Sequence, residues 1–156
     1  MASGAYNKGM TDLLDGTVDY LTDTLKWLLV STATPYTYNP DHDVVDAGGA
    51  NDVVDAETNV TGYTRGYGGA GRKTLASKTV TENDTNNRVE LDCADVSWTA
   101  LGAGQTLEAA ILVKEGGAND TTSRLFVYLD PTNIATNGSD VQLQIPSLGF
   151  LHFTIQ

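Results

Sequence analysis

The sequence predicts a mainly β fold, an antiparallel β-sandwich or jelly roll with a short N-terminal helix and one long loop excursion. Short segments in which apolar and polar residues alternate recur in the second half of the chain, and turn-forming residues separate them. No long helical pattern lies between these segments, which favours two packed antiparallel sheets over alternating strands and helices. A chain of 156 residues fits one domain, residues 1–156, around a single core.

The first 22 residues, 1–22, are interpreted as an N-terminal arm. Apolar residues spaced three and four apart predict a short helix within Ala5–Leu21, interrupted at Gly16. Docking segments concentrate at chain termini that lack a strong core pattern. We therefore expect removal of residues 1–20 to leave a folded domain and to weaken attachment to a partner.

A long loop excursion away from the core is predicted at residues 31–71. Within it, Ser31–Thr64 has few long apolar residues and carries turn-forming residues at Asn39-Pro40-Asp41 and Gly48-Gly49. One short helical turn is expected at Val44–Val45. Connections of this length are uncommon in compact domains, which favours a functional role for the excursion.

Eight strands are predicted, and the first is Thr24–Thr32, where Leu28 and Val30 break strict alternation as in a strand covered on both faces. The others span Arg72–Val80, Arg88–Cys93, Val96–Ala100, Thr106–Glu115, Arg124–Leu129, Val141–Ile145 and Phe150–Ile155. Four alternating sets are expected to form the core, namely Val89, Leu91 and Cys93; Leu107, Ala109, Ile111 and Val113; Leu125, Val127 and Leu129; and Val141, Leu143 and Ile145.

The charge balance argues against two classes of partner. Nine Lys and Arg residues against twenty Asp and Glu residues give a net charge of −11, which repels nucleic acids and anionic membrane surfaces. The longest apolar run, Trp27-Leu28-Leu29-Val30, is far shorter than the roughly 20 residues that cross a bilayer. A single cysteine and the lack of a secretory signal pattern predict folding in a reducing cytoplasm.

Gly66–Gly71 matches the glycine pattern G-x-G-x-x-G of dinucleotide-binding turns. Such a turn needs a following helix whose N–H groups bind phosphate, whereas the segment after it alternates like a strand. Arg72 also separates Lys73 from the last glycine, unlike the arrangement in a P-loop. We therefore predict a flexible glycine loop that binds no nucleotide.

Carboxylates are concentrated in one acidic segment, Asp41–Glu57. They belong to Asp41, Asp43, Asp46, Asp52, Asp55 and Glu57. Calcium takes several oxygen ligands from flexible loops, but the spacing here does not fit an EF-hand. A solvated acidic loop is therefore the favoured interpretation, and a weak calcium site is the alternative.

Neither a hydrolase motif nor a zinc or thiol-redox motif is present in the sequence. Cys93 lies where the alternation points inward, which is typical of a small buried side chain. The two histidines, His42 and His152, have no partner that the sequence identifies. The sequence therefore predicts a protein that is not an enzyme, with no catalytic residue, no cofactor and no metal.

Charges of opposite sign separate along the excursion. Asp41–Glu57 contains no Lys or Arg, whereas Arg65, Arg72, Lys73 and Lys78 lie in a stretch without acids. A dipolar segment with several tyrosines suits contact with an identical subunit or another patterned surface, although incidental clustering in a solvated loop explains it equally well. The predicted partner-binding residues are Tyr36, Tyr38, Tyr63, Arg65, Tyr67, Arg72 and Lys73.

Several longer segments are distinctive when taken together. They are Tyr6-Asn7-Lys8-Gly9, Leu14-Asp15-Gly16-Thr17-Val18-Asp19, Leu21-Thr22-Asp23-Thr24-Leu25-Lys26, Tyr38-Asn39-Pro40-Asp41-His42-Asp43, Asp95-Val96-Ser97-Trp98-Thr99-Ala100 and Ser123-Arg124-Leu125. Through most of its length the chain thereby resembles a family of small virion proteins of tailed bacteriophages and prophages.

That resemblance implies a phage particle component. Small β-sandwich proteins of this kind often decorate capsids as trimers, so the expected protein is a homotrimeric capsid decoration, or cement, protein that binds the major capsid protein and stabilises the outer shell. It would assemble in the host cytoplasm and reside on the virion surface. The alternatives are a head–tail connector or tail component, and a carbohydrate-binding module in which exposed Trp98 or Tyr128 stacks on sugars. Trp98 alternates with Val96 like a buried residue, which weakens the last alternative.

Overall fold

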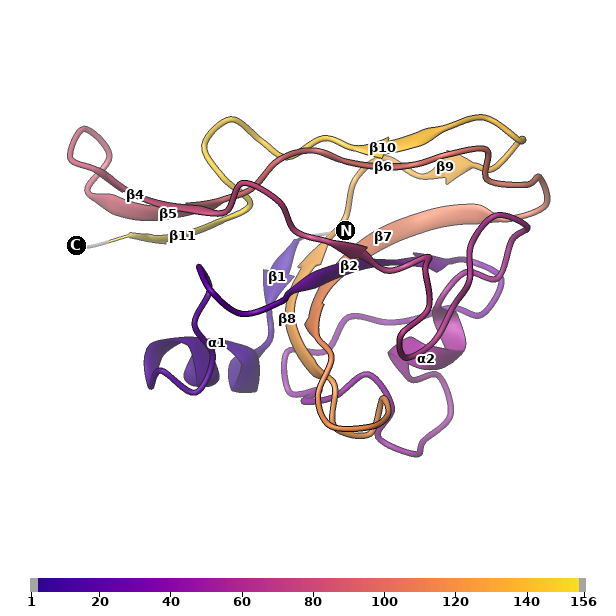
Figure 1. The fold of residues 1–156 in the computed structure, drawn as a ribbon, viewed down its shortest axis with the longest axis horizontal. Coiled ribbons are helices and arrows are strands. Elements are labelled where there is room, and N and C mark those ends of the chain that lie inside the picture. The colour runs from indigo at the N-terminus through magenta and orange to yellow at the C-terminus, as the bar shows by residue number, and fades with distance from the viewer. Residues whose placement is uncertain (1–2, 155–156) are drawn as a thin grey trace.

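The computed structural model describes residues 3–154 and is mainly β, with antiparallel strand pairs and one short N-terminal helix, as in a β-sandwich. This confirms the predicted fold class. In chain order the elements are β1 (Gly4–Ala5), α1 (Asn7–Leu14), β2 (Lys26–Ser31), α2 (Val53–Ala56), β3 (Lys73–Thr74), β4 (Thr79–Asn83), β5 (Arg88–Asp92), β6 (Val96–Trp98), β7 (Thr106–Lys114), β8 (Arg124–Leu129), β9 (Ile134–Ala135), β10 (Val141–Leu143) and β11 (Leu151–Thr154) (Figure 1).

The central sheet has the order β1-β8-β7-β2-β3, and β9 extends it along β7. Its middle strands read KWLLVS and TLEAAILVK, and nearly every residue in them is buried. Continuous aliphatic runs of this kind belong to strands that are covered on both faces. The prediction that Leu28 and Val30 mark such a strand is therefore confirmed.

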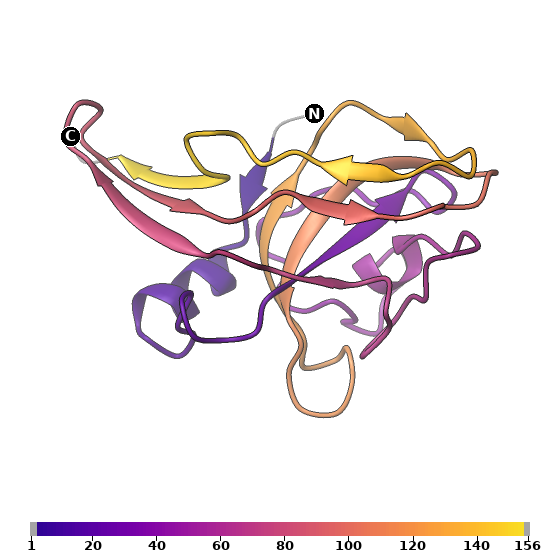
Figure 2. The ribbon, with the colours of Figure 1, turned by 45° about the horizontal axis from the view of Figure 1, so that its top comes forward.

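One face of the central sheet is covered by a second β layer. Its β6–β10 pair lies over the sheet, and the three-stranded sheet β11-β5-β4 continues to one side, beyond the end of the central strands (Figures 1 and 2). We call β4, β5 and β11 the projecting sheet. The core between the two layers contains large, almost fully buried side chains, among them Trp27, Trp98, Leu101, Leu112 and Phe126.

The opposite face of the central sheet is covered by the segment between β2 and the end of α2, which we call the cover segment, residues 32–57. Its Tyr36, Val45 and Val53 pack against Leu28 and Ile111 of the sheet and form a second core. The prediction that this segment is an excursion away from the core is therefore wrong. A few well-spaced apolar residues are sufficient to close a sheet face, because the sheet itself contributes most of the apolar area.

Two β-bulges decide which core each residue enters. Ser31 pairs with Leu107 and Val30 with Ala109, so Glu108 is the extra residue and Leu107 turns to the opposite face from Ala109. A second bulge places Leu125 and Val127 in different cores. A bulge reverses the alternation of side chains between the two faces of a strand. The predictions that Leu107 shares a face with Ala109, and that Leu125 shares a face with Val127, are therefore wrong.

The N-terminal segment is an integral part of the domain. The Tyr6 side chain is fully buried in the second core, and its backbone N–H donates to Phe126 O at 2.9 Å. At Gly9, α1 lies so close to β8 that an added Cβ would come within 2.1 Å of Leu125 O. Tyr20 is also buried, and its hydroxyl donates to Asp92 O at 2.5 Å. The interpretation of residues 1–22 as a dispensable arm is therefore corrected for residues 3–22.

Most strand predictions are confirmed, with ends that differ by a few residues. The predicted strand Arg72–Val80 is instead divided into β3 and β4, because Ser77 has a φ of 52° and interrupts the extended chain. The predicted helical turn at Val44–Val45 is wrong. Val44 forms a bridge with Arg124, and the helical turn lies at α2. The short strands β1 and β9 were not predicted.

Candidate functional site

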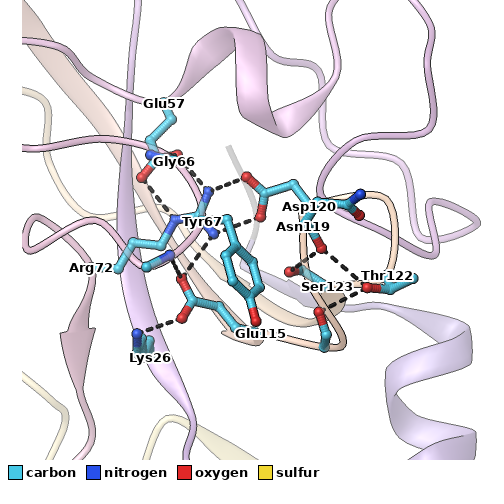
Figure 3. A network of polar contacts seen from close by, with 12 residues as sticks. Lys26, Glu57, Gly66, Tyr67, Arg72, Glu115, Asn119, Asp120, Thr122 and Ser123 are labelled. Carbon is cyan, nitrogen blue, oxygen red and sulfur yellow. Dashed lines mark hydrogen bonds and ion pairs between the residues drawn. The ribbon is translucent and has the colours of Figure 1, made fainter.

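Arg72 lies at the centre of a buried network of ion pairs that ties three parts of the chain together (Figure 3). Its guanidinium forms two hydrogen bonds with the Glu57 carboxylate, at 3.0 and 2.7 Å, and two with that of Asp120, at 2.7 and 2.9 Å. Glu115 accepts a fifth bond at 3.2 Å and also pairs with Lys26. Bidentate contacts of this kind, with two parallel hydrogen bonds to one carboxylate, are among the strongest that arginine makes.

Burial alone disfavours the charged form of Arg72. The hydrogen bonds to Glu57 and Asp120 outweigh that effect and raise the pKa of the guanidinium above its ordinary value. Tyr63 donates to Glu57 at 3.0 Å, and burial followed by the Glu57 charge raises the pKa of this tyrosine. Arg72 therefore stays charged although its side chain is fully buried.

The glycine loop Gly66–Gly71 is held by the same carboxylates. The N–H of Gly66 donates to Glu57 at 3.0 Å, the N–H of Gly68 donates to Glu115 at 2.9 Å, and the Tyr67 hydroxyl donates to Gly117 O at 2.6 Å. The chain's own acids thus occupy N–H groups that a phosphate would need. Strand β3 follows the loop, as predicted, but the prediction of a flexible loop is corrected by these contacts.

The structure divides the seven predicted partner-binding residues into two groups. Tyr36, Tyr63 and Arg72 are only 3%, 5% and 3% exposed, so their side chains lie inside the domain and the prediction is corrected for them. The remaining four, Tyr38, Arg65, Tyr67 and Lys73, are exposed or half-buried and stay predictions. The opposite charges recognised in the sequence meet within one chain, because Glu57 of the acidic segment binds Arg72 of the basic stretch.

Tyr36 and Tyr38 belong to a cluster that fastens the cover segment. The hydroxyls of Tyr6 and Tyr36 are 3.0 Å apart, and His42 Nδ1 lies 3.0 Å from the Tyr36 hydroxyl. Tyr38 packs against the ring of Tyr128 at a centroid distance of 5.2 Å and donates to Ala5 O at 2.6 Å. Tyr36 and Tyr38, which were predicted to bind a partner, therefore make packing and hydrogen-bond contacts within the chain.

The acidic segment does not gather its carboxylates at one point. Within residues 3–154, no group of three or more His, Cys, Asp or Glu side chains is placed to hold a metal ion. Asp52 accepts the N–H groups of Ala47 and Gly49, at 3.0 and 2.9 Å, while Glu57 binds Arg72. Cys93 is 6% exposed, which confirms the predicted burial, and that burial raises the pKa of its thiol to about 11.

An apolar groove of about 570 Å³ lies between α1, with the turn after it, and the projecting sheet. Leu13, Leu14, Val18, Val80, Val89 and Phe153 contribute its apolar lining. The Leu14 side chain is 75% exposed and that of Val80 is 46% exposed. Exposed large apolar side chains gathered on one surface are typical of sites where proteins meet.

Strand register explains the apolar side of this groove. Val80, Leu91 and Leu151 are cross-strand neighbours and share one face of the projecting sheet. Glu82, Val89 and Phe153 form the next row on the same face, with the carboxylate of Glu82 at its margin. Thr81, Glu90 and His152 lie on the opposite face, so the projecting sheet has one apolar and one polar side.

Carboxylates border the helical side of the groove. Asp19 lines it and accepts backbone N–H bonds from Leu21 and Thr22, at 2.8 and 3.2 Å. Hydrogen bonding by the Thr22 side chain, followed by these backbone bonds, holds the pKa of Asp19 below its ordinary value. Asp15, at the end of α1, accepts the Thr17 N–H at 2.8 Å, and hydrogen bonding by the Thr17 side chain, followed by this backbone bond, likewise lowers the pKa of Asp15. Both side chains are therefore charged at neutral pH, beside an apolar surface.

The two aromatic residues considered for sugar stacking are buried. Trp98 is 1% exposed, as its alternation predicted, and its indole N–H donates to Gly71 O at 2.6 Å. Tyr128 is fully buried in the second core. Neither side chain is available to a sugar ring, so this version of the carbohydrate-binding alternative is corrected.

Comparisons with protein-family models, with curated proteins and with solved structures gave no match. Within the described part of the chain, no helix is both long and apolar enough to cross a membrane. Without a match to known proteins, the candidate functional surface is the groove beside the projecting sheet, where large apolar side chains are exposed. Sequence reasoning missed it, because its residues come from three distant segments, although the exposed position of Val80 on a short alternating strand was a signal.

Proposed function

We propose that this protein is a non-enzymatic structural component of a tailed-phage particle, which decorates the outer capsid shell and stabilises it. The observation that carries the proposal is the groove, an apolar surface exposed on a part of the fold that projects from the body. A sheet that leaves part of its apolar face in water gains free energy when another protein covers that face. The fold therefore favours a role in assembly.

The projecting sheet offers a second feature that suits assembly. Its outer strands, β4 and β11, each pair only with β5 among the described strands, so both edges expose backbone groups. Four of the five residues of β4 are exposed. Such edges are templates for strands of other chains unless a partner covers them. Self-association into the trimer expected of a decoration protein belongs to the same proposal.

The resemblance to small virion proteins supports a phage particle in preference to other assemblies. One of its segments, Leu14-Asp15-Gly16-Thr17-Val18-Asp19, contributes to the helical side of the groove. A head–tail connector or tail component is the alternative within the same class. The two positions differ in copy number, because a decoration protein covers the whole shell and a connector forms one ring.

The test is to purify particles from infected cells, measure the amount of this chain per capsid subunit, and locate it in a density map. A decoration protein is expected at shell positions over the entire head, in a fixed ratio to the capsid subunit. Density confined to the neck or tail would replace this position with the connector alternative. Absence of the chain from intact particles would contradict the proposal.

A further inference from the structure

We propose that the groove between α1 and the projecting sheet binds an amphipathic segment of the capsid shell protein, one in which apolar residues are flanked by Lys or Arg. This inference rests on the proposed function and names the partner of that site. The apolar residues of the partner segment are inferred from the groove lining, because Leu14 and Val80 are 75% and 46% exposed on either side of the same groove. A partner that inserts apolar side chains there removes both from water.

The Lys or Arg residues of the partner segment are inferred from the carboxylates at the margins of the groove. Asp19 lines the groove on its helical side, Asp15 directly precedes the lining residue Gly16, and Glu82 shares the row of Val89 and Phe153 on the sheet side. In the part of the chain that the structure describes, none of these three carboxylates forms an ion pair. A cation from outside therefore finds an acidic margin on both sides of the apolar surface.

The chain's own cations do not neutralise this margin. Six of the nine Lys and Arg side chains form ion pairs with carboxylates elsewhere in the chain, namely Lys8, Lys26, Arg72, Arg88, Lys114 and Arg124. Lys78 stands near the groove, 5.9 Å from the centroid of the Tyr20 ring, and donates to Asp23 O. Lys8 attracts the charge of Asp15 but forms its ion pair with Asp12, and neither Asp19 nor Glu82 forms an ion pair within residues 3–154, which keeps the margin acidic.

The acidic charge of the chain also favours this occupant over a second copy of the chain. Each copy carries a net charge of −11, so two grooves placed face to face would bring like charges together around the apolar contact. A segment of the shell with Lys or Arg beside its apolar residues meets no such repulsion. Binding in this mode weakens as salt rises, because exposed charge pairs are screened over about 8 Å at physiological ionic strength.

The first experiment adds purified protein to particles that lack it and measures occupancy. The groove variants are Leu14→Glu and Val80→Glu, and the matched control is Leu148→Glu, which changes a leucine that is 51% exposed and does not line the groove. We expect each groove variant to bind about tenfold or more weakly, as for loss of a central contact, and the control to bind like wild type. Circular dichroism verifies the fold, and Leu14→Ser replaces any variant that is unfolded.

The second experiment tests the charges with Glu82→Gln and the control Asp55→Asn, an exposed carboxylate on α2 at the other end of the molecule (Figure 1). At low salt we expect Glu82→Gln to weaken binding about two- to fivefold, as for an exposed ion pair, and the difference to shrink as salt rises. Asp55→Asn is expected to match wild type at every salt concentration.

A photo-crosslinker in place of Leu14 then identifies the occupant by mass spectrometry of the crosslinked peptide. A crosslink to a shell segment with apolar residues flanked by Lys or Arg supports the proposal. A crosslink to a second copy of this chain overturns it, as does normal binding by both groove variants, and in either case the decoration role stands. If wild-type protein fails to bind the particles, the decoration role itself is overturned and this inference with it.

Discussion

The body of the molecule and the projecting sheet solve the packing of a β-sheet in different ways. In the body, the second β layer covers one face of the central sheet and the cover segment, residues 32–57, covers the other, so nearly every residue of β2 and β7 is buried. In the projecting sheet, β4 is exposed and the apolar face carrying Val89 and Phe153 is only partly covered. The body is complete as one chain, whereas the projecting sheet has surface left for a partner.

The polar interactions of the two regions also differ in their burial. In the body, a fully buried guanidinium joins Glu57, Asp120 and Glu115, and two of these carboxylates also hold the glycine loop Gly66–Gly71. On the projecting sheet, Arg88 pairs with Glu90 within one strand, on the polar face. A buried network becomes costly when one member is lost, while a pair near the surface contributes little. This contrast predicts that the buried network stabilises the body, while the proposed function assigns contacts with other proteins to the projection.

The largest expected effect comes from breaking the network of the body. Arg72→Met leaves the carboxylates of Glu57 and Asp120 buried without their cation, and we expect the free energy of unfolding to fall by about 3–5 kcal/mol. Urea denaturation followed by circular dichroism measures the change. The control is Arg65→Met at an exposed position, expected within about 0.5 kcal/mol of wild type.

Adding Glu57→Gln and Asp120→Asn to Arg72→Met removes the buried charges together, and we expect the triple variant to recover part of the lost stability. If Arg72→Met alone unfolds at the same urea concentration as wild type, the network does not hold the body together.

A smaller effect is expected where α1 meets β8. Gly9→Ala would place a methyl group within 2.1 Å of Leu125 O, so the helix must shift away from the sheet, at a cost of about 1–3 kcal/mol. The same unfolding measurement tests this. In a helix without such a contact, alanine is more favourable than glycine. An increase in stability would therefore show that α1 is not docked closely on the sheet.

The boundary between the two regions can be tested through Cys93, which follows β5 and is buried in the core between the layers. Because burial raises the pKa of this thiol to about 11, we expect very slow labelling of the native protein by a thiol reagent at pH 8. At urea concentrations below global unfolding, labelling should accelerate if the projecting sheet opens before the body. Labelling that follows only the loss of the circular dichroism signal would contradict separate opening.

The smallest expected effect concerns pH and the pair on the projecting sheet. Hydrogen bonds from Arg88 and Asn83 lower the pKa of Glu90 below its ordinary value of 4.5. A carboxylate whose pKa is lowered by folding adds stability above its unfolded pKa, and this stability is lost as the pH falls through the folded pKa. Glu90→Gln should therefore be slightly less stable than wild type at pH 7, and the difference should vanish in acid. Urea midpoints at several pH values test this, and a constant difference would exclude the pair as its cause.

Much of the fold could be predicted from local pattern. Strand β8 matches its predicted range, and β2, β5, β6, β7 and β10 lie within theirs, because alternation and turn residues are local properties of the chain. The break of Arg72–Val80 at Ser77 was not predicted, because the local alternation does not mark its positive φ of 52°. The bulge at Glu108 was equally invisible, because an extra residue in one strand is defined only against its partner strand.

The candidate site was less predictable than the fold. The sequence singled out Tyr36, Tyr63 and Arg72 as surface residues because they lie in a polar, turn-rich stretch, yet all three are buried. Their partners, such as Asp120, are distant along the chain, and only folding brings them together. The groove was missed for the same reason, since Leu14 and Val80 belong to segments that meet only in the folded protein.

By itself, the sequence determined the mainly antiparallel β class, the burial of Cys93 and Trp98 and the net charge of −11. Alternation and composition are local properties, which do not depend on distant partners. Only the tertiary structure decided that residues 32–57 cover a second core, that Arg72 neutralises acids of its own chain, and that an apolar groove stays open beside α1. Those outcomes depend on long-range packing, in which a residue's environment is set by whichever segments close around it.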